Sequence, residues 1–471
     1  MNDQFDFSSE NFESGKTVER FENMLKNNES YFFDVEEFEL IIDHYIEHNK
    51  PKIAMKVIEM ATNQHPRSIS LLIFKSNLLL AVHKPHEALK VIQSVEAIEP
   101  ENIEILLTKA SIFSQLRMPK KSIEHFLKAL QFTESSEKED ILISVAFEYE
   151  NLNKYNDSIK YLKKALKLNP ENETALYELG FCFDMVDLNE EGIRFYSNFL
   201  DDHPYSASAW YNLGLLYAKE ELFEKALESM DFVLAIKEDF TAVYFSKANI
   251  FEKLGKYDQA IQCYRESFNY EKPDGTTYYY LANCYQLNED YRRAMQQYKN
   301  ALKADPLHCD AMISLGLLYS KNGRLTEGVH YLKKALDTEP ENPEYWYTFG
   351  EVQAKLGFYE EAVLAFEKVI ELDNDNEMVW GDLSVAYMRL GEKEKSMKAI
   401  GKGIETFPDF AEFQYILSGI LYNFGHSQEA LEKLEIALTL DPERVEVLFE
   451  LLPEIITDNM VDELVEKYKS N

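Results

Sequence analysis

The stretch Ala209–Tyr217, with the sequence AWYNLGLLY, decides the fold, because its large apolar residues recur at helical spacing around one glycine. Trp210, Leu213 and Tyr217 stand at i, i+3 and i+7, which places them on one face of a helix. A second small residue, Ala226, follows in the next helical stretch. Small residues at these two places allow two helices of a hairpin to approach each other closely.

This pattern recurs along the chain about every 34 residues. The prolines show the period first, because Pro51, Pro85 and Pro119 lie 34 residues apart. Self-similarity at this stride indicates a stack of repeated helical hairpins. Aligned units start at residues 35, 69, 103, 139, 173, 207, 241, 275, 309, 343, 377 and 411. The eighth position is small in every unit but the first, which has Ile42, and the twentieth position is small in all of them.

The quoted stretch, together with Ala226 and the ending ALKLNP at residues 165–170, resembles the tetratricopeptide-repeat (TPR) motif, and the resemblance covers residues 35–442. It implies an all-α fold, an α-solenoid in which TPR helix–turn–helix repeats wind into a right-handed superhelix. The chain as a whole resembles uncharacterised bacterial multi-TPR proteins.

Three segments follow from this alignment. Residues 1–34 are expected to form an acidic tail, disordered over residues 1–15, and a capping helix over residues 16–27. Residues 35–444 form the twelve repeats. Residues 445–471 form C-terminal capping helices and a tail, with a break near Pro453 or Asp458, because the last repeat would otherwise expose its apolar face. Glycines such as Gly255 and Gly323 are expected to end first helices in the left-handed conformation.

The charge of the chain disfavours two classes of partner. Lys and Arg number 49 against 83 Asp and Glu, which gives a net charge of −34. A phosphate backbone or an anionic membrane would be repelled, so neither nucleic acid nor a membrane is expected as a partner. The acidity serves solubility or attracts a basic partner. With no signal peptide, no long apolar run and four cysteines without CxxC spacing, the sequence predicts a cytoplasmic protein with reduced thiols.

Motifs that would support catalysis are weak. The run from His44 to His48 matches H-x-x-E-H, in which two histidines on one helical turn can share a zinc ion, but its place inside a repeat favours packing. His308 and Cys309 are adjacent in a repeat loop, where a Cys–His pair is not expected. Phosphate-binding glycine loops and nucleophile motifs are absent from the sequence. We therefore expect no enzymatic activity, no cofactor and no metal.

In TPR proteins the first helix of each repeat lines the concave face, and the resemblance implies that positions 2, 5, 6, 9, 12 and 13 point there. In the fifth to eighth repeats these positions give an aromatic surface with interleaved amides. Tyr and Phe offer contact area at low entropic cost, and an amide can pair with a peptide backbone. The alternative is that the aromatic rings pack between repeats. The candidate groove residues are Tyr177, Phe181, Tyr211, Asn212, Phe245, Asn249, Tyr279, Tyr280, Asn283 and Gln286.

Position 13 carries a row of basic residues that could bind carboxylates or simply complement the end of the helix. They are Lys219, Lys253, Lys321, Lys355 and Arg389. The basic residues of a chaperone-tail clamp at positions 2, 5 and 6 are missing. The sequence thus predicts a non-enzymatic scaffold or adaptor that binds an extended peptide or a partner protein in the groove. The alternative is a regulatory or substrate-docking subunit of a separate enzyme.

Overall fold

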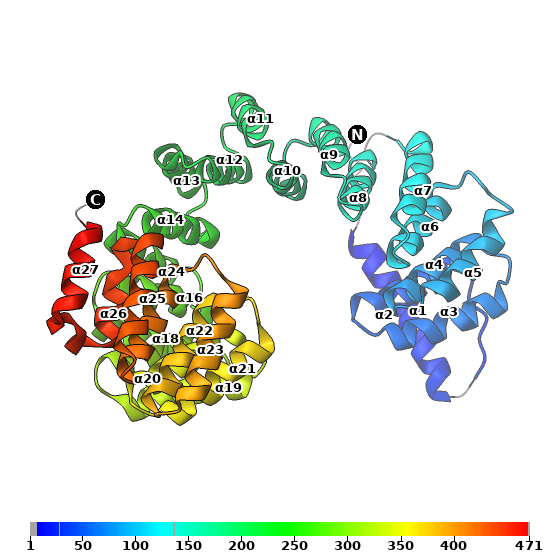
Figure 1. The fold of residues 1–471 in the computed structure, drawn as a ribbon. Coiled ribbons are helices and arrows are strands. Elements are labelled where there is room, and N and C mark those ends of the chain that lie inside the picture. The colour runs from blue at the N-terminus through cyan, green and yellow to red at the C-terminus, as the bar shows by residue number, and fades with distance from the viewer. Residues whose placement is uncertain (1–6, 28, 135–136, 470–471) are drawn as a thin grey trace. The chain divides into compact units, whose positions relative to one another are not determined.

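The computed structural model describes residues 7–27, 29–134 and 137–469, and every regular element in these ranges is a helix (Figure 1). Antiparallel helices follow one another as hairpins, and neighbouring hairpins pack on each other within the two units described next. The expectation of an all-α solenoid is confirmed. The chain divides into two compact units, Met1–Val243 and Tyr244–Asn471, which we call the N-terminal and C-terminal units. In the described part of the chain, no helix has both the length and the apolar character that crossing a membrane requires.

The N-terminal unit holds six hairpins. Their first helices are α2 (Val35–Glu47), α4 (Ile69–Ala81), α6 (Ile103–Gln115), α8 (Lys138–Glu150), α10 (Glu173–Met185) and α12 (Ala207–Lys219). Their second helices are α3 (Pro51–Gln64), α5 (Pro85–Glu96), α7 (Pro119–Phe132), α9 (Tyr155–Leu168), α11 (Asn189–Asp202) and α13 (Phe223–Ile236). Proline opens three of these second helices, where its missing N–H has no partner to lose.

The C-terminal unit repeats the same arrangement. Its first helices are α14 (Thr241–Lys253, whose first turn lies before the unit boundary), α16 (Gly275–Leu287), α18 (Cys309–Lys321), α20 (Pro343–Lys355), α22 (Glu377–Arg389) and α24 (Ala411–Asn423). Its second helices are α15 (Tyr257–Ser267), α17 (Tyr291–Ala304), α19 (Leu325–Thr338), α21 (Tyr359–Leu372), α23 (Lys393–Thr406) and α25 (Ser427–Leu440).

Small residues at positions 8 and 20 mark the point where the two helices of a hairpin cross. In the hairpin of α18 and α19, a Cβ on Gly328 would lie 2.8 Å from the Gly316 carbonyl oxygen, so a larger residue cannot enter without moving the backbone. Several of the small residues are serines whose hydroxyl donates across the crossing to a carbonyl of the other helix, although Ser384 donates to Gly381 in its own helix. Ser122 donates to the Ala110 carbonyl at 2.9 Å, and Ser418 donates to the Ala430 carbonyl at 2.8 Å.

The turn inside each hairpin contains one residue with positive φ, fourteen residues after the start of the aligned unit. Five of these residues are glycines, with φ between 68° and 81°, as expected for Gly255 and Gly323. The other seven are not glycine, and they include Arg117 and Glu221, with φ of 55° and 56°. The hairpin geometry therefore imposes a left-handed residue in every repeat, whichever side chain the sequence supplies.

Helix α1 (Phe7–Asn27) caps the first repeat by burying Val18, Phe21 and Met24. Disorder was expected over residues 7–15, whereas α1 begins at Phe7 in the structure. Residues 7–27 contain no proline, and a single interior glycine, Gly15, costs about 1 kcal/mol. A helix anchored by three buried side chains can therefore continue towards the N-terminus. Residues 1–6, for which disorder was also expected, lie outside the described residues.

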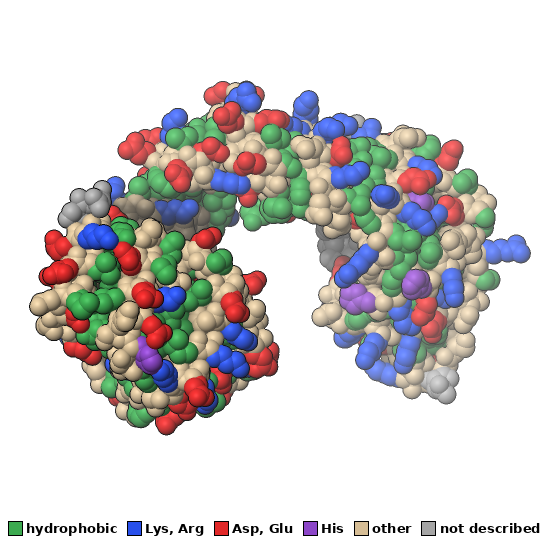
Figure 2. Space-filling model, in the orientation of Figure 1, with side chains coloured by type: hydrophobic (Ala, Val, Ile, Leu, Met, Phe, Trp, Pro, Cys, Tyr) green, Lys and Arg blue, Asp and Glu red, His purple; other side chains and the backbone are tan. Residues whose placement is uncertain are grey.

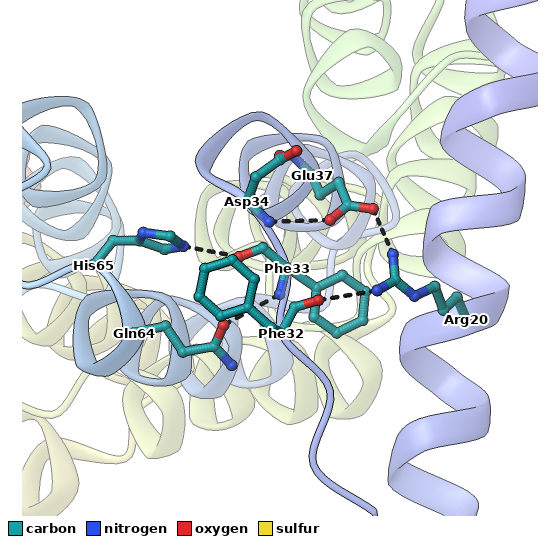
Figure 3. Close-up of polar contacts among 7 residues, drawn as sticks. All are labelled: Arg20, Phe32, Phe33, Asp34, Glu37, Gln64 and His65. Carbon is teal, nitrogen blue, oxygen red and sulfur yellow. Dashed lines mark hydrogen bonds and ion pairs between the residues drawn. The ribbon is translucent and has the colours of Figure 1, made fainter.

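The segment between α1 and α2 is fixed by polar contacts from both sides (Figure 3). The Arg20 guanidinium donates to Glu37 Oε1 at 2.6 Å and to the Phe32 carbonyl at 2.9 Å. From the opposite side, Gln64 Oε1 accepts from the Phe33 N–H at 3.2 Å. These contacts hold α1 against α2. Helix α1 therefore caps the apolar end of the stack of repeats.

The C-terminal cap resembles a thirteenth repeat that is interrupted. A further unit would start at residue 445, which is 34 residues after Ala411, and α26 (Glu446–Leu451) begins one residue later, after the short helix η1 (Pro442–Val445). Pro453 ends α26, because it cannot donate a backbone hydrogen bond. The chain continues through η2 (Pro453–Thr457) to α27 (Asn459–Lys469), which buries Val461 and Val465.

Candidate interaction surface on the first helices

Within each unit, several first helices of successive repeats contact each other directly. Such contacts join α4 to α6 and α10 to α12 in the N-terminal unit, and α18, α20, α22 and α24 in series in the C-terminal unit. No two second helices make a contact of that extent in the described ranges. A stack curves towards the side on which its elements lie closer together. First helices therefore form the inner face of each unit.

A pocket of about 320 Å³ lies between α10 and α12, and every residue of its lining comes from these two first helices. Tyr177 and Phe181 stand on α10 with exposed fractions of 55% and 42%. Leu215 and Leu216 face them from α12. Figure 2 shows hydrophobic side chains gathered over α10. Two exposed aromatic rings beside an apolar wall offer a large contact area that the chain itself leaves uncovered.

The polar groups of this pocket are already partnered inside the chain. Asn212 is only 3% exposed, and its NH2 group donates to the Ser208 carbonyl at 2.7 Å. Its Oδ1 lies against Gly180, where a Cβ would collide with it. The Asp184 carboxylate accepts from Lys219, and this hydrogen bond raises the pKa of Lys219. The pocket therefore presents aromatic and apolar surface, with its one carboxylate neutralised.

The candidate residues of the C-terminal unit are arranged differently. Phe245 and Tyr280 line another pocket, of about 260 Å³, together with the loop before α16. The Tyr298 hydroxyl lies 2.6 Å from Asn283 Oδ1 and 3.0 Å from Gln286 Oε1, so these amides support a buried tyrosine.

The remaining candidates have mixed surroundings. Tyr279 packs beside the His308 ring, with centroids 4.9 Å apart. In the N-terminal unit, Tyr211 packs against Phe240 at 5.1 Å. Asn249 is exposed. The structure thus brings Tyr177, Phe181 and Asn212 together in one pocket. Elsewhere, aromatic packing accounts for part of the predicted surface.

The basic row at position 13 is largely occupied by contacts within the chain. Lys219 also donates to the Asp184 carbonyl at 3.1 Å, at the end of α10. Lys321 donates to the Tyr291 hydroxyl at 3.3 Å, and Lys355 lies 3.6 Å from Glu351. Arg389 donates to the Leu451 carbonyl at 2.7 Å and so ties α22 to the C-terminal cap. These contacts favour a structural role for the row over binding of a partner's carboxylates.

The two motifs that resembled catalytic sites take part in local structure. His48 Nδ1 lies 2.7 Å from the His44 carbonyl, and burial lowers the pKa of His44. His308 caps α18 by accepting from the Ala311 N–H at 3.4 Å, while burial raises the pKa of the Cys309 thiol to about 11. Across the described ranges, no three His, Cys, Asp or Glu side chains gather where they could hold a metal ion.

The inner positions of the first three repeats also carry a surface that was not among the predicted groove residues. There a pocket of about 400 Å³ is lined by α2, α4 and α6. Its lining residues occupy positions 2, 5, 6 and 9 of the aligned units, so the positions used for the fifth to eighth repeats would have found it. They include Glu39, Phe74 and Glu104.

Comparison with known families agrees with the architecture. The tetratricopeptide-repeat family model matches residues 140–172, 207–240, 241–273 and 275–306. A second model, described as anaphase-promoting complex, cyclosome, subunit 3, matches residues 298–369. No curated protein matches the chain.

Several solved structures are similar in part. The C-terminal part of a TPR repeat-containing protein from Cytophaga hutchinsonii is 19% identical, with a TM-score of 0.43; the match covers 54% of this chain and 98% of that one. YrrB, described as a TPR protein with an unusual peptide-binding site, is 17% identical, with a TM-score of 0.33 and coverage of 39% and 95%. A match in the APC/C hetero-tetramer Cut9–Hcn1 is 12% identical, with a TM-score of 0.39 and coverage of 82% and 90%.

Proposed function

We propose that this chain, a member of the tetratricopeptide-repeat family, is an interaction scaffold that binds an extended segment of a partner protein on its first helices. The observation that carries the proposal is the pocket between α10 and α12, where Tyr177 and Phe181 are exposed beside an apolar wall. Large aromatic side chains around an open pocket are the usual source of binding energy at protein interfaces.

Rigidity of the site supports this function. The backbones of α10 and α12 are held together by close packing, since a Cβ on Gly180 would collide with Asn212. The Asp184–Lys219 ion pair adds a second link between the same helices. A partner segment therefore meets a surface that is formed before it binds, and little conformational entropy of the scaffold is lost on association.

The chemistry of the pocket indicates what it would bind. Asp184 is paired with Lys219, so the pocket offers no free charge of its own. Its walls are aromatic and aliphatic. We expect an apolar side chain of the partner to enter between Tyr177 and Leu215. The buried Asn212 supports the pocket floor, which makes Tyr177 and Phe181 the residues to test.

A peptide library displayed on phage and selected on the immobilised full-length chain tests the proposal. The variant carries Tyr177→Ala and Phe181→Ala. The matched control carries Tyr205→Ala and Phe132→Ala, two aromatic residues that are exposed but lie outside this pocket. Loss of two aromatic anchors should weaken a selected peptide by about 100-fold, since each such anchor contributes roughly 1–2 kcal/mol.

The control should bind the selected peptides as the wild type does. Peptides that bind the Tyr177/Phe181 variant with unchanged affinity would contradict the proposal, as would a library from which the wild type selects nothing. Circular dichroism of all three proteins checks that the substitutions leave the helices formed.

A further inference from the structure

The pocket formed by α2, α4 and α6 differs in chemistry from the one between α10 and α12. Ile73, Phe74 and Leu107 give it an apolar floor. Glu39 on α2 and Glu104 on α6 stand on either side of that floor. The other lining residues are polar and uncharged, and no Lys, Arg or His is among them. The pocket thus combines an apolar centre with carboxylates on two flanks.

Neither carboxylate is neutralised by the chain. No hydrogen bond or ion pair engages the side chain of Glu39 or Glu104 within the described ranges. A nearby position on α6 carries Lys109, but its ammonium group is already bound to Glu96 at 2.7 Å. The inner positions of the first three repeats hold five carboxylates and no basic residue. These carboxylates are Glu36, Glu39, Asp43, Glu47 and Glu104.

Like charges crowd one another on α2. Glu39, Asp43 and Glu47 are spaced four residues apart, which puts them on one helical face. Burial raises the pKa of Asp43, and the charges of Glu47 and Glu39 raise it further. Carboxylates that repel one another over an uncovered apolar floor are stabilised when a cation approaches them.

The two pockets differ in whether the chain neutralises their carboxylates. The pocket between α10 and α12 contains one carboxylate, Asp184, and Lys219 from the next repeat neutralises it. The pocket of α2, α4 and α6 contains two carboxylates, and the chain supplies no counterpart for either. Both carboxylates are therefore available to a cationic group of a partner.

We infer that the α2–α4–α6 pocket is a second recognition site, and that it binds a segment of a partner protein in which an apolar residue is flanked by lysine or arginine on both sides. The apolar side chain covers Ile73, Phe74 and Leu107, and the flanking cations pair with Glu39 and Glu104. This site is separate from the one between α10 and α12 and does not depend on it.

Fluorescence anisotropy with short labelled peptides tests this inference on the full-length chain. The probe peptide has a central Lys-Leu-Lys between glycine and serine residues. In a Lys-Ser-Lys peptide serine replaces the apolar residue, and in a Glu-Leu-Glu peptide glutamate replaces both cations. The Lys-Leu-Lys peptide should bind about tenfold more tightly than the Lys-Ser-Lys peptide, because leucine buries apolar area in the pocket. The Glu-Leu-Glu peptide should not bind, and raising the salt from about 0.05 M to 0.5 M should weaken the Lys-Leu-Lys complex.

Two variants locate the site. Glu39→Gln with Glu104→Gln should weaken Lys-Leu-Lys binding by up to about 25-fold, since each exposed pair contributes up to roughly fivefold. The charge-matched control is Glu59→Gln with Glu101→Gln, which changes exposed residues of the same unit outside the pocket. The control should keep wild-type affinity.

Three results would overturn the inference. One is equal binding of Lys-Leu-Lys and Lys-Ser-Lys, which would reveal only the long-range field of an acidic chain. Another is an equal loss in the control variant, and the third is no binding to the wild type. The Tyr177→Ala/Phe181→Ala protein should bind Lys-Leu-Lys normally, so failure at one pocket can be told apart from failure at the other.

Discussion

Two glycines in α23 test whether close packing between helices limits the size of a residue, because the same Gly→Ala substitution can be made at both. Gly401 and Gly403 lie two residues apart in this helix. A Cβ on Gly401 would meet no heavy atom within 4 Å. A Cβ on Gly403 would lie 2.9 Å from Trp380 Cβ and 3.1 Å from two ring carbons of Phe413. We therefore expect Gly401→Ala to stabilise the local structure and Gly403→Ala not to stabilise it.

The magnitudes follow from two opposing effects. Replacing an interior helical glycine by alanine stabilises a helix by about 1 kcal/mol at either position. At Gly403 the added methyl group overpacks a site whose neighbours, Trp380 and Phe413, are 6% and 1% exposed and have little room to move. Overpacking of this kind costs about 1–3 kcal/mol. Gly403→Ala should thus be neutral or destabilising by up to about 2 kcal/mol, and the two variants should differ by about 1–3 kcal/mol.

Native-state hydrogen exchange is the suitable assay, because an array of repeats does not unfold as one two-state unit. Amides of residues 377–423, which span α22, α23 and α24, report local opening. Gly401→Ala should slow their exchange by about fivefold, which corresponds to 1 kcal/mol. Gly403→Ala should leave it unchanged or accelerate it. Amides of the N-terminal unit serve as the internal control. If both variants slow exchange equally, the close approach of α23 to α22 and α24 does not constrain the size of residue 403.

Three further predictions concern single residues. Glu221 adopts φ of 56°, which costs an L-residue about 1–2 kcal/mol, so Glu221→Gly should raise the Tm despite the flexibility of glycine; a lower Tm would show that the turn is not strained. Burial raises the pKa of Asp382 to about 6, above its unfolded value, so its stabilising contribution is complete below about pH 4 and is lost as the pH rises through 6. Asp382→Asn should therefore remove a fall in stability of about 2–3 kcal/mol between about pH 4 and pH 7, measured by urea unfolding. Burial raises the pKa of the Cys182 thiol to about 12, so iodoacetamide at about pH 8 should label it only in urea, as read by mass spectrometry.

The fold could be predicted from the sequence because its cause is visible there. Small residues at two fixed positions permit helices to cross closely, and a constant stride repeats that crossing. The left-handed residue in each turn could be predicted only in some repeats. A glycine such as Gly323 favours this conformation, whereas Arg117 and Glu221 do not. In those repeats the hairpin imposes the conformation on a side chain that does not favour it. The helix over residues 7–15 was missed because polar composition hides a helix that is anchored further along the chain.

The candidate surface was less predictable, since one residue can face a ligand or a neighbouring repeat. Tyr177 and Tyr279 occupy the same position of their repeats. The first is exposed beside a pocket, while the second packs near Tyr298 and His308. The difference depends on residues 19 and 29 positions away, which no local pattern reveals. Similarly, Asn212 reads as a free amide in the sequence, but its NH2 group is bound to Ser208 one helical turn earlier.

We expect the way the chain uses its own cations to set the specificity of the inner face. All repeats share one backbone, so neighbouring stretches of the inner face can differ only through the side chains at a few positions. Where Lys219 neutralises Asp184, the remaining surface is aromatic, and we propose that it selects apolar groups. Where no lysine pairs with Glu39 or Glu104, we propose that the same architecture selects cations around an apolar residue. A basic residue introduced beside Glu39, for example by Asn77→Lys, should therefore abolish the preference for Lys-Leu-Lys while leaving the pocket between α10 and α12 unchanged.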